Sequence, residues 1–371
     1  MYEYLMRYLV ALLPLITLLA ACGTATTLPQ RTTEKGGFLL TPAHSGKLPS
    51  GDFAYNPNTA RFIDKMVREH GFDRQQLHNL LAQTKRLDSV LRQMEQQAPT
   101  PTTQAPAGPN GFWLRYRNKF ITADNVQNGV AFWNQYQDAL QRAWQVYGVP
   151  PEIIVGIIGV ETRWGQVMGK TRVIDALATL AFDYPRRADY FVGELETFLL
   201  MSHTEGNDPL ELRGSFAGAM GYGQFMPSSY KRYAVDFDGD GHINLWEPVD
   251  AIGSIANYFK AHGWVKGGAV AVQAYGQAPG LEHGFKTRYP IDSLAAAGLS
   301  PQGSLGDNHQ ASLLRLDIGT GYQYWYGLPN FYTITRYNHS TYYAMVVWQL
   351  GEAVGRSARG SFESVHHSVS R

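Results

Sequence analysis

The chain has very little cysteine: Cys22 is the only one among its 371 residues, so no disulfide can form within it. Charge is also scarce. Asp, Glu, Lys and Arg make up 17% of the residues and the formal net charge is +1, which gives no indication of nucleic acid or of a strongly charged partner. We find no internal repeat and no low-complexity domain. What is present is an apolar content of 44%, typical of a globular protein, and a length that predicts two or three packed units.

The first apolar run follows Arg7 and is too short to span a bilayer as a retained helix. Its charged start and apolar middle are typical of a secretory signal. The string LAAC, which ends at Cys22, resembles a bacterial lipobox. The resemblance implies that residues 1–21 are a lipoprotein signal peptide and that Cys22 is acylated. Gly23 follows where an aspartate would suggest the inner membrane, so the periplasmic face of the outer membrane is the expected location. The alternative is a plain signal peptide with an incidental cysteine.

Composition divides the part before residue 151 into a tether and a helical domain. Residues 22–50 are rich in Thr, Gly, Pro and Ser and contain few apolar residues, which indicates a flexible tether. Helical patterning over 51–150 predicts a helical domain. The Pro-rich segment 98–111 interrupts it as a linker or an extended strap, because prolines at this density break a helix.

The remainder is predicted to be mainly α with a small β portion, so the fold class is α+β. Helical patterning continues with breaks over 151–264. Short strand patterns between Gly-rich turns predict a small β domain at 265–308. The C-terminal part, 309–371, is expected to end in a helix that begins at about Thr341.

Glu161 is the most informative residue because it is a carboxylate on an apolar helix face. Its segment, PPEIIVGIIGVETRWG, begins with two prolines, which the first helical turn tolerates. Counting by three and four places Glu161 in line with Ile154, Ile158, Trp164 and Gly165. A carboxyl group among apolar side chains has a raised pKa, as a general acid near neutral pH requires. The alternative is a buried glutamate that pairs with a cation for structural reasons.

Two other stretches offer polar groups in unusual settings. The glycine-rich segment that starts at Gly214 contains Ser215 and Gln224, and its glycines would let backbone approach a ligand closely. Tight helix packing is the alternative. Tyr337 begins a polar stretch just before the last helix, for which Ser340 is the predicted N-cap. The chain carries 22 Tyr and 8 Trp, and aromatic faces suit sugar rings, although most of these residues must belong to the core.

The segment from Asp236 to Glu247 fits the twelve-residue EF-hand loop, with acids at positions 1, 3 and 5, glycine at 6 and glutamate at 12. The predicted calcium ligands are Asp236, Asp238, Asp240, the backbone carbonyl of His242, and Glu247. Because the loop is single, one structural Ca²⁺ is favoured over a switch. The alternative is a turn that binds no metal.

Three strings, VGIIGVETRWG, GSFAGAMGYGQFMPSSY and NLWEPVDAIGSIANYFKAHGW, resemble the membrane-bound lytic murein transglycosylase B family. The match covers nearly all of the chain after about residue 36. It implies a lysozyme-like core at 151–264 that contains the calcium loop at 236–250, an added helical domain, a small β domain, and a C-terminal part that completes the catalytic cleft. It also implies cleavage of the β-1,4 bond between N-acetylmuramic acid and N-acetylglucosamine in peptidoglycan, with no cofactor for catalysis.

By this resemblance, Glu161 is the catalytic acid of the G-V-E-T motif. The family's substrate-binding residues fall on Tyr116, Arg186, Arg187, Ser215, Gln224, Tyr258, Tyr337, Asn338 and Tyr343. Read alone, Arg186 and Arg187 are a solvated charge pair; the resemblance makes them candidates for binding peptide stems or the muramyl carboxylate. The family's calcium loop is longer and ends at an aspartate that matches Asp250, so Glu247 and Asp250 are both candidates for the last ligand.

No second acid stands beside Glu161 in a comparable motif, and the nearest downstream acids, Asp175 and Asp183, read as helix or turn residues. The resemblance implies that Glu161 first protonates the glycosidic oxygen. As an anion it then takes the proton of the sugar's own C6 hydroxyl, which gives a 1,6-anhydromuramoyl end. A hydrolase that uses water is the alternative among enzymes. A non-catalytic wall-binding lipoprotein is the alternative outside them, although a binder has no use for a buried acid.

The expected partners are peptidoglycan glycan strands and, through the lipid on Cys22, the outer membrane. Enzymes of cell-wall synthesis are candidate protein partners, and nucleic acid is not expected. The sequence leaves open whether cleavage is internal or from an end, and which peptide stem is preferred. It contains nothing that demands more than a monomer.

Overall fold

The computed structural model describes residues 51–97, 108–278 and 280–369, with side chains as far as residue 360. The predicted signal peptide, the acylated Cys22, the tether and most of the strap lie outside these residues. In the described part, no single helix is long and apolar enough to cross a membrane. Helices α6 (Gln137–Tyr147) and α7 (Pro151–Thr162) are long and apolar enough only when they are taken together, and the pair is bent by 118°. The protein itself buries nearly all of α7.

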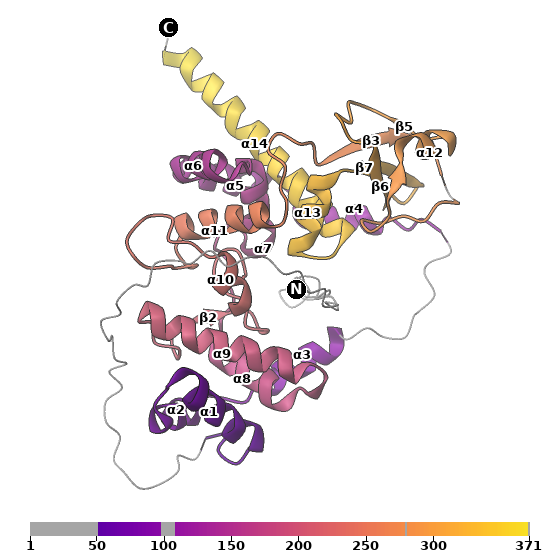
Figure 1. The fold of residues 1–371 in the computed structure, drawn as a ribbon. Coiled ribbons are helices and arrows are strands. Elements are labelled where there is room, and N and C mark those ends of the chain that lie inside the picture. The colour runs from indigo at the N-terminus through magenta and orange to yellow at the C-terminus, as the bar shows by residue number, and fades with distance from the viewer. Residues whose placement is uncertain (1–50, 98–107, 279, 370–371) are drawn as a thin grey trace.

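Helix α7 lies at the centre of the fold, and α14 (Thr341–Val369) packs along it (Figure 1). A helix that is apolar on all sides belongs inside a core, and α7 is of this kind. Two glycines allow the close approach of the helices. A Cβ added at Gly156 would lie 2.3 Å from the Val347 carbonyl oxygen, and one at Gly351 would lie 1.9 Å from the Glu152 carbonyl oxygen. The two backbones therefore touch where larger residues would separate them.

We expect Gly351→Ala to lower the free energy of unfolding by about 1–3 kcal/mol, because the added methyl group overlaps a backbone oxygen and must push the helices apart. Thermal unfolding measures the loss. Gly193→Ala is the matched control, since Gly193 lies within helix α9 and a Cβ there would meet nothing within 4 Å. Equal melting temperatures for the two variants would contradict the close packing of α7 and α14.

Helix α7 ends at Thr162, so the expectation that Trp164 and Gly165 continue its face is wrong. Arg163, Trp164 and Gly165 all have positive φ, at 50°, 55° and 90°. The Trp164 ring folds back beneath the helix, and its Nε1 donates a hydrogen bond to the Val155 carbonyl oxygen at 3.1 Å. Packing of the indole thus stabilises a left-handed backbone that helical periodicity does not predict.

The predicted helical domain, 51–150, is divided between two places (Figure 1). Its first three helices form a group that packs on α8 (Val173–Asp183): α1 (Pro57–His70), α2 (Arg74–Ala82) and α3 (Asp88–Gln97). The next three surround the core helices α7, α11 (Pro248–Ala261) and α14: α4 (Phe112–Arg117), α5 (Ala123–Gln135) and α6. Helical periodicity indicates each helix but not the helix it packs against.

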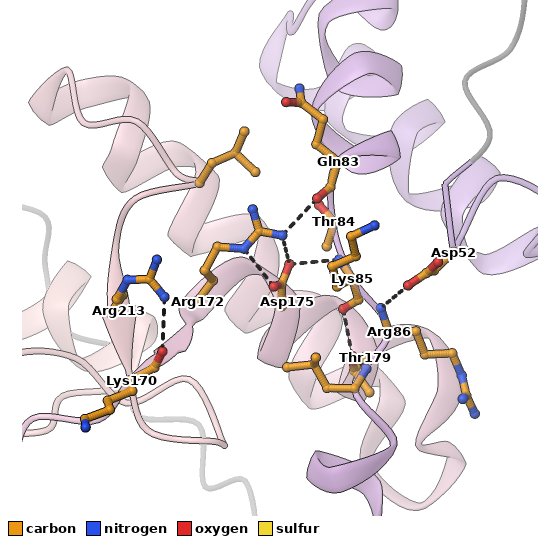
Figure 2. A network of polar contacts seen from close by, with 12 residues as sticks. Asp52, Gln83, Thr84, Lys85, Arg86, Lys170, Arg172, Asp175, Thr179 and Arg213 are labelled. Atoms are coloured by element: carbon orange, nitrogen blue, oxygen red, sulfur yellow. Dashed lines mark hydrogen bonds and ion pairs between the residues drawn. The ribbon is translucent and has the colours of Figure 1, made fainter.

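The loop that joins α2 to α3 is held on α8 by polar contacts, which Figure 2 shows from close by. The Asp175 carboxylate accepts the N–H of Lys85 at 2.8 Å and pairs with the Arg172 guanidinium at 2.7 Å. The Thr179 hydroxyl accepts the N–H of Leu87 at 3.0 Å. These buried acceptors fix the N-terminal helices on the core.

Beyond α8, the short helix η2 (Pro185–Arg187) leads into α9 (Ala188–Glu205), on which α10 (Pro227–Tyr233) packs.

An antiparallel sheet with the strand order β4-β6-β7-β3-β5 forms the β portion. Its strands are β3 (Ala271–Tyr275), β4 (Tyr289–Pro290), β5 (Ser300–Pro301), β6 (Gln310–Asp317) and β7 (Tyr322–Gly327), and α12 (Ile291–Ala296) lies between β4 and β5. The sheet therefore extends past residue 308, its predicted end, since β6 and β7 are its two longest strands. A smaller pair joins β1 (Thr171–Arg172) to β2 (Arg213–Gly214), and α13 (Pro329–Tyr337) leads into α14. The predicted α+β class, mainly α, is confirmed.

Candidate active site

Glu161 lies in the last turn of α7 and is partly accessible, although most of the helix is buried. Burial raises the pKa of its carboxyl from 4.5 to about 7, and a hydrogen bond from Tyr343 partly opposes this rise. A substantial fraction of the carboxyl therefore carries a proton near neutral pH. An accessible, protonated acid can donate that proton to a bound molecule.

The Tyr343 hydroxyl donates a hydrogen bond to Oε1 of Glu161 at 2.5 Å. Tyr343 belongs to the first turn of α14, where the Ser340 hydroxyl accepts its backbone N–H at 3.3 Å, so the predicted N-cap is present. Because Oε1 accepts from Tyr343, the proton of the neutral acid belongs on Oε2. The cap, the tyrosine and the close helix contact together orient the carboxyl.

Three further tyrosines from the predicted site lie around this pair. Burial, and then the charge of Glu161, raise the pKa of both Tyr116 and Tyr337. Tyr337 donates a hydrogen bond to the Gly223 carbonyl oxygen at 2.5 Å. Its ring meets the Tyr258 ring edge-on, with centroids 4.9 Å apart. The structure thus brings four of the predicted tyrosines together near the acid.

The glycine-rich segment from Gly214 forms a compact loop without helix. The Ser215 hydroxyl oxygen accepts the N–H groups of Ala217 and Ala219 at 3.3 and 3.0 Å, which leaves its own proton for another acceptor. Gln224 adopts a φ of 51°, and its amide donates to the Gly221 carbonyl oxygen at 2.9 Å. A strained residue held in this way is typical of functional loops.

Thr162 connects this loop to the end of α7, and sequence reasoning missed it. Its hydroxyl oxygen lies 3.1 Å from the carbonyl oxygens of both Ile158 and Tyr222, and it accepts the N–H of Gly165 at 3.2 Å. The signal was available, because Thr162 is a polar residue next to Glu161 at the end of an apolar helix. Its contact with Tyr222 fixes the loop relative to the acid.

Asn338 follows Tyr337 directly, at the C-terminal end of α13. Its side-chain oxygen Oδ1 is buried and has no hydrogen-bond partner among the described residues. Buried acceptors are nearly always satisfied, so this oxygen marks a position where a ligand donor would bind.

Arg186 and Arg187 lie on η2 with different partners. Arg186 is exposed and lies 3.9 Å from the Glu95 carboxylate of α3. The Arg187 guanidinium lies 4.2 Å from the centre of the Tyr190 ring. In the described part of the chain, no hydrogen bond or ion pair joins either arginine to Glu161, so their predicted role as ligand-binding residues stays a prediction.

The acids nearest to Glu161 in the downstream sequence are used elsewhere. Asp175 holds the α2–α3 loop (Figure 2). Asp183 pairs with Arg86 at 2.5 Å and accepts a hydrogen bond from Asn56 at 2.9 Å. Within the described residues, no second carboxylate hydrogen-bonds to Glu161. The described part of the site therefore contains one acid, Glu161, with tyrosine side chains around it.

Carboxylates of the predicted calcium loop converge. The ligand atoms of Asp236, Asp238 and Asp250 all lie within 4.8 Å of one another. Asp250 is buried, and its carboxylate accepts the N–H groups of Phe237 and Asn244 at 2.6 and 2.7 Å. Clustered carboxylate oxygens are the ligands that Ca²⁺ prefers.

The other predicted calcium ligands have separate contacts. Glu247 is the N-cap of α11, where its carboxylate accepts the N–H groups of Val249 and Asp250 at 2.6 and 3.0 Å. Asp240 is exposed and accepts the N–H of His242 at 2.8 Å. Of the two candidates for the last ligand, Asp250 is the one that lies with the other acids.

Glu205, at the end of α9, is a second residue that sequence reasoning missed. Its carboxylate accepts the N–H of Ile243 at 3.0 Å and the Tyr230 hydroxyl at 2.6 Å. It thus connects the acidic loop to α9 and α10. No sequence pattern links these positions, because the contacts join separate segments of the chain.

The fold and the site define a class of protein: an enzyme with a lysozyme-like core that presents an acid of raised pKa among tyrosines. The chain belongs to the membrane-bound lytic murein transglycosylase B family, and the family model described as "Transglycosylase SLT domain" matches residues 54–352.

Relatives from two organisms support the assignment. The chain is 74% identical over 353 residues to membrane-bound lytic murein transglycosylase B of Escherichia coli K12, covering 94% of this chain and 98% of that protein. A solved structure of the E. coli lytic transglycosylase Slt35 in complex with calcium has a TM-score of 0.80 and 76% identity, covering 83% of this chain and 96% of that one. SltB3 of Pseudomonas aeruginosa in complex with NAG-anhNAM-pentapeptide has a TM-score of 0.68 and 28% identity, covering 80% of this chain and 78% of that one.

Proposed function

We propose that the protein is a lytic transglycosylase that cleaves the β-1,4 bond between N-acetylmuramic acid and N-acetylglucosamine in peptidoglycan. The observation that carries the proposal is the partly accessible carboxyl of Glu161, whose pKa burial raises to about 7. Membership of the family supports the reaction, and the names of the relatives support murein as the substrate.

In the first step, Glu161 donates the proton on Oε2 to the glycosidic oxygen as the bond to C1 breaks. The carboxylate that results keeps the hydrogen bond from Tyr343 to Oε1, which stabilises its charge. The muramyl N-acetyl group, or dipoles of the site, balance the positive charge at C1. Tyr337, Asn338 and Ser215 are suited to position the sugar, and the unpartnered Oδ1 of Asn338 would accept one of its donors.

In the second step, the Glu161 carboxylate takes the proton of the C6 hydroxyl, and the C6 oxygen bonds to C1. The products are a 1,6-anhydromuramoyl end and a free N-acetylglucosamine hydroxyl, and no water is consumed. A nucleophile within the same sugar needs no second carboxylate to activate water, which agrees with the finding that no second carboxylate of the described residues hydrogen-bonds to Glu161. The complex of SltB3 with an anhydro-sugar ligand supports this product.

The calcium proposal is a single structural ion at the acidic loop, with Asp236, Asp238 and Asp250 as carboxylate ligands and no part in catalysis. The convergence of these three groups supports it, as does the calcium complex of Slt35. Asp240 and the carbonyl of His242 remain proposed ligands from the loop spacing. Glu247 is better explained as the cap of α11.

Location follows from the sequence and from the relative's name. We propose attachment to the periplasmic face of the outer membrane through a lipid on Cys22, which the membrane-bound relative supports. The glycan strands of the wall are then the substrate within reach, and cell-wall synthesis enzymes are candidate partners.

The rate should depend on pH through Glu161. The acid must be protonated to start the reaction, and its pKa is about 7, so we expect activity to fall as the pH rises through about 7. Tyr343→Phe removes a hydrogen bond that favours the charged form, so the pKa rises and the falling limb moves to higher pH. Initial rates measured across pH locate the falling limb in the wild-type protein and in Tyr343→Phe. An unshifted limb in Tyr343→Phe would contradict the role of the hydrogen bond.

Purified sacculi test the proposal directly. The protein should release soluble fragments that contain both sugars, and the number of glycan ends should rise with time. Release of peptides without new glycan ends, or binding without any release, would favour another enzyme or the wall-binding lipoprotein.

A further inference from the structure

The loop after β3 and helix α13 place positively charged side chains close to aromatic rings on the protein surface. Lys286 lies 5.8 Å from the centre of the Phe285 ring, and the Arg288 guanidinium lies 5.7 Å from the centre of the Tyr332 ring. The two rings are neighbours, with centroids 6.5 Å apart. Lys286, Arg288 and Tyr332 are all exposed, so these groups face solvent.

His339 and Arg336 extend the same cluster. The His339 ring stacks on the Phe285 ring at 6.1 Å with an angle of 11° between the planes. Arg336 is exposed and its guanidinium lies 3.5 Å from the His339 ring nitrogen. Burial, and then the charges of Arg336 and Lys286, lower the pKa of His339, so the charged groups that act on it are cations. We name this cluster the cationic-aromatic patch; it comprises Phe285, Lys286, Arg288, Tyr332, Arg336 and His339.

The cations of the patch have no carboxylate partner in the described part of the chain. None of Lys286, Arg288 and Arg336 forms an ion pair there. With a net charge of only +1 for the whole chain, three unpaired cations in one place are a local excess. Such an excess favours an anionic ligand.

The patch is continuous with the site. Arg336 and His339 flank Tyr337 and Asn338 in the chain, and the Phe285 N–H donates to the Thr341 hydroxyl at 3.3 Å, two residues before Tyr343. Two members of the patch therefore lie within two residues of Asn338 in the chain, so the patch adjoins the site.

We propose that the cationic-aromatic patch binds the carboxylates of the peptide stem that N-acetylmuramic acid carries, and so favours stem-bearing glycan as the substrate. The inference rests on the proposed function. Arginine binds carboxylates in a planar, paired geometry, and the rings hold the guanidinium and ammonium groups in place. A membrane surface is the other anionic partner; continuity with Asn338 favours the stem.

The test compares binding of two glycans to Glu161→Gln, which cannot consume them. One glycan carries its peptide stems, and the other has had them removed by an amidase. Stem-bearing glycan should bind more tightly, and Arg288→Gln or Arg336→Gln should each weaken that binding by about two- to fivefold, as expected for exposed charge pairs. Binding of the stem-free glycan should not change. Arg61→Gln, which removes an exposed charge from α1, is the control and should bind both glycans as Glu161→Gln alone does.

Equal binding of the two glycans, or unchanged binding in both arginine variants, would overturn the inference and leave the proposed function intact. Vesicles of anionic lipid provide the second arm. If Arg288→Gln abolishes binding to vesicles but not to stems, the patch faces a membrane and the inference is overturned. Failure of the wild-type protein to cleave sacculi would instead defeat the proposed function.

Discussion

Glu161→Gln should lower the rate of glycan cleavage by about a thousandfold or more while the protein stays folded, because the amide cannot donate an acidic proton and cannot take one back. The amide oxygen still accepts the Tyr343 hydroxyl, so the geometry of the site is retained. Turnover of purified sacculi measures the rate. Binding of glycan should be nearly unchanged, since the two side chains have almost the same shape.

Glu152→Gln is the matched control, because Glu152 belongs to the same helix but pairs with Arg359 of α14 and not with the tyrosines of the site. The Glu152→Gln protein should be somewhat less stable than the wild-type protein, and it should retain the wild-type rate of glycan cleavage. Substantial cleavage by a folded Glu161→Gln protein would contradict the assignment of the acid, whereas loss of activity in both variants would indicate a general effect of altering α7.

Calcium should raise the melting temperature by several degrees. A ligand that binds only the folded state at about one hundred times its dissociation constant adds roughly 2.7 kcal/mol of stability, or about 3–5 °C for a protein of this size. Thermal unfolding with calcium and with chelator measures the difference. We also expect chelator to lower activity, since the Tyr222 N–H donates to the Leu245 carbonyl oxygen at 2.9 Å and so connects the acidic loop to the loop beside Glu161.

Asp236→Asn should remove most of this calcium-dependent increase, because it takes away one charge of the proposed site. Asp292→Asn, which changes an exposed acid of α12 outside the loop, should leave the increase intact. Identical melting curves with calcium and with chelator in the wild-type protein would contradict a stabilising ion.

The acid could be found from sequence because its signals are local. Glu161 interrupts an apolar helix within a recognisable motif, and Ser340 is a typical N-cap; the structure confirms the helix and the cap. The hydrogen bond from Tyr343 joins residues 182 positions apart, and only the family resemblance placed Tyr343 near the acid. The contact of Thr162 with Tyr222 was missed for the same reason, although Thr162 itself is a polar residue next to Glu161.

The errors in the fold prediction share a physical cause, which is long-range packing. Helical periodicity predicts that the face of α7 continues to Trp164. The helix instead ends at Thr162, and the Trp164 indole folds back to donate a hydrogen bond to the Val155 carbonyl oxygen. The predicted β domain ends at residue 308. Yet β7 pairs with both β3 and β6, and these pairings extend the sheet to Gly327.

The mass of the released muropeptides tests the central claim most directly. Digestion of sacculi in ¹⁸O-labelled water, followed by mass spectrometry, should give 1,6-anhydromuramoyl ends that contain no label, because the C6 oxygen of the same sugar, and not a water oxygen, forms the new bond to C1. Reducing ends that are heavier by one labelled water would show hydrolysis and contradict the account.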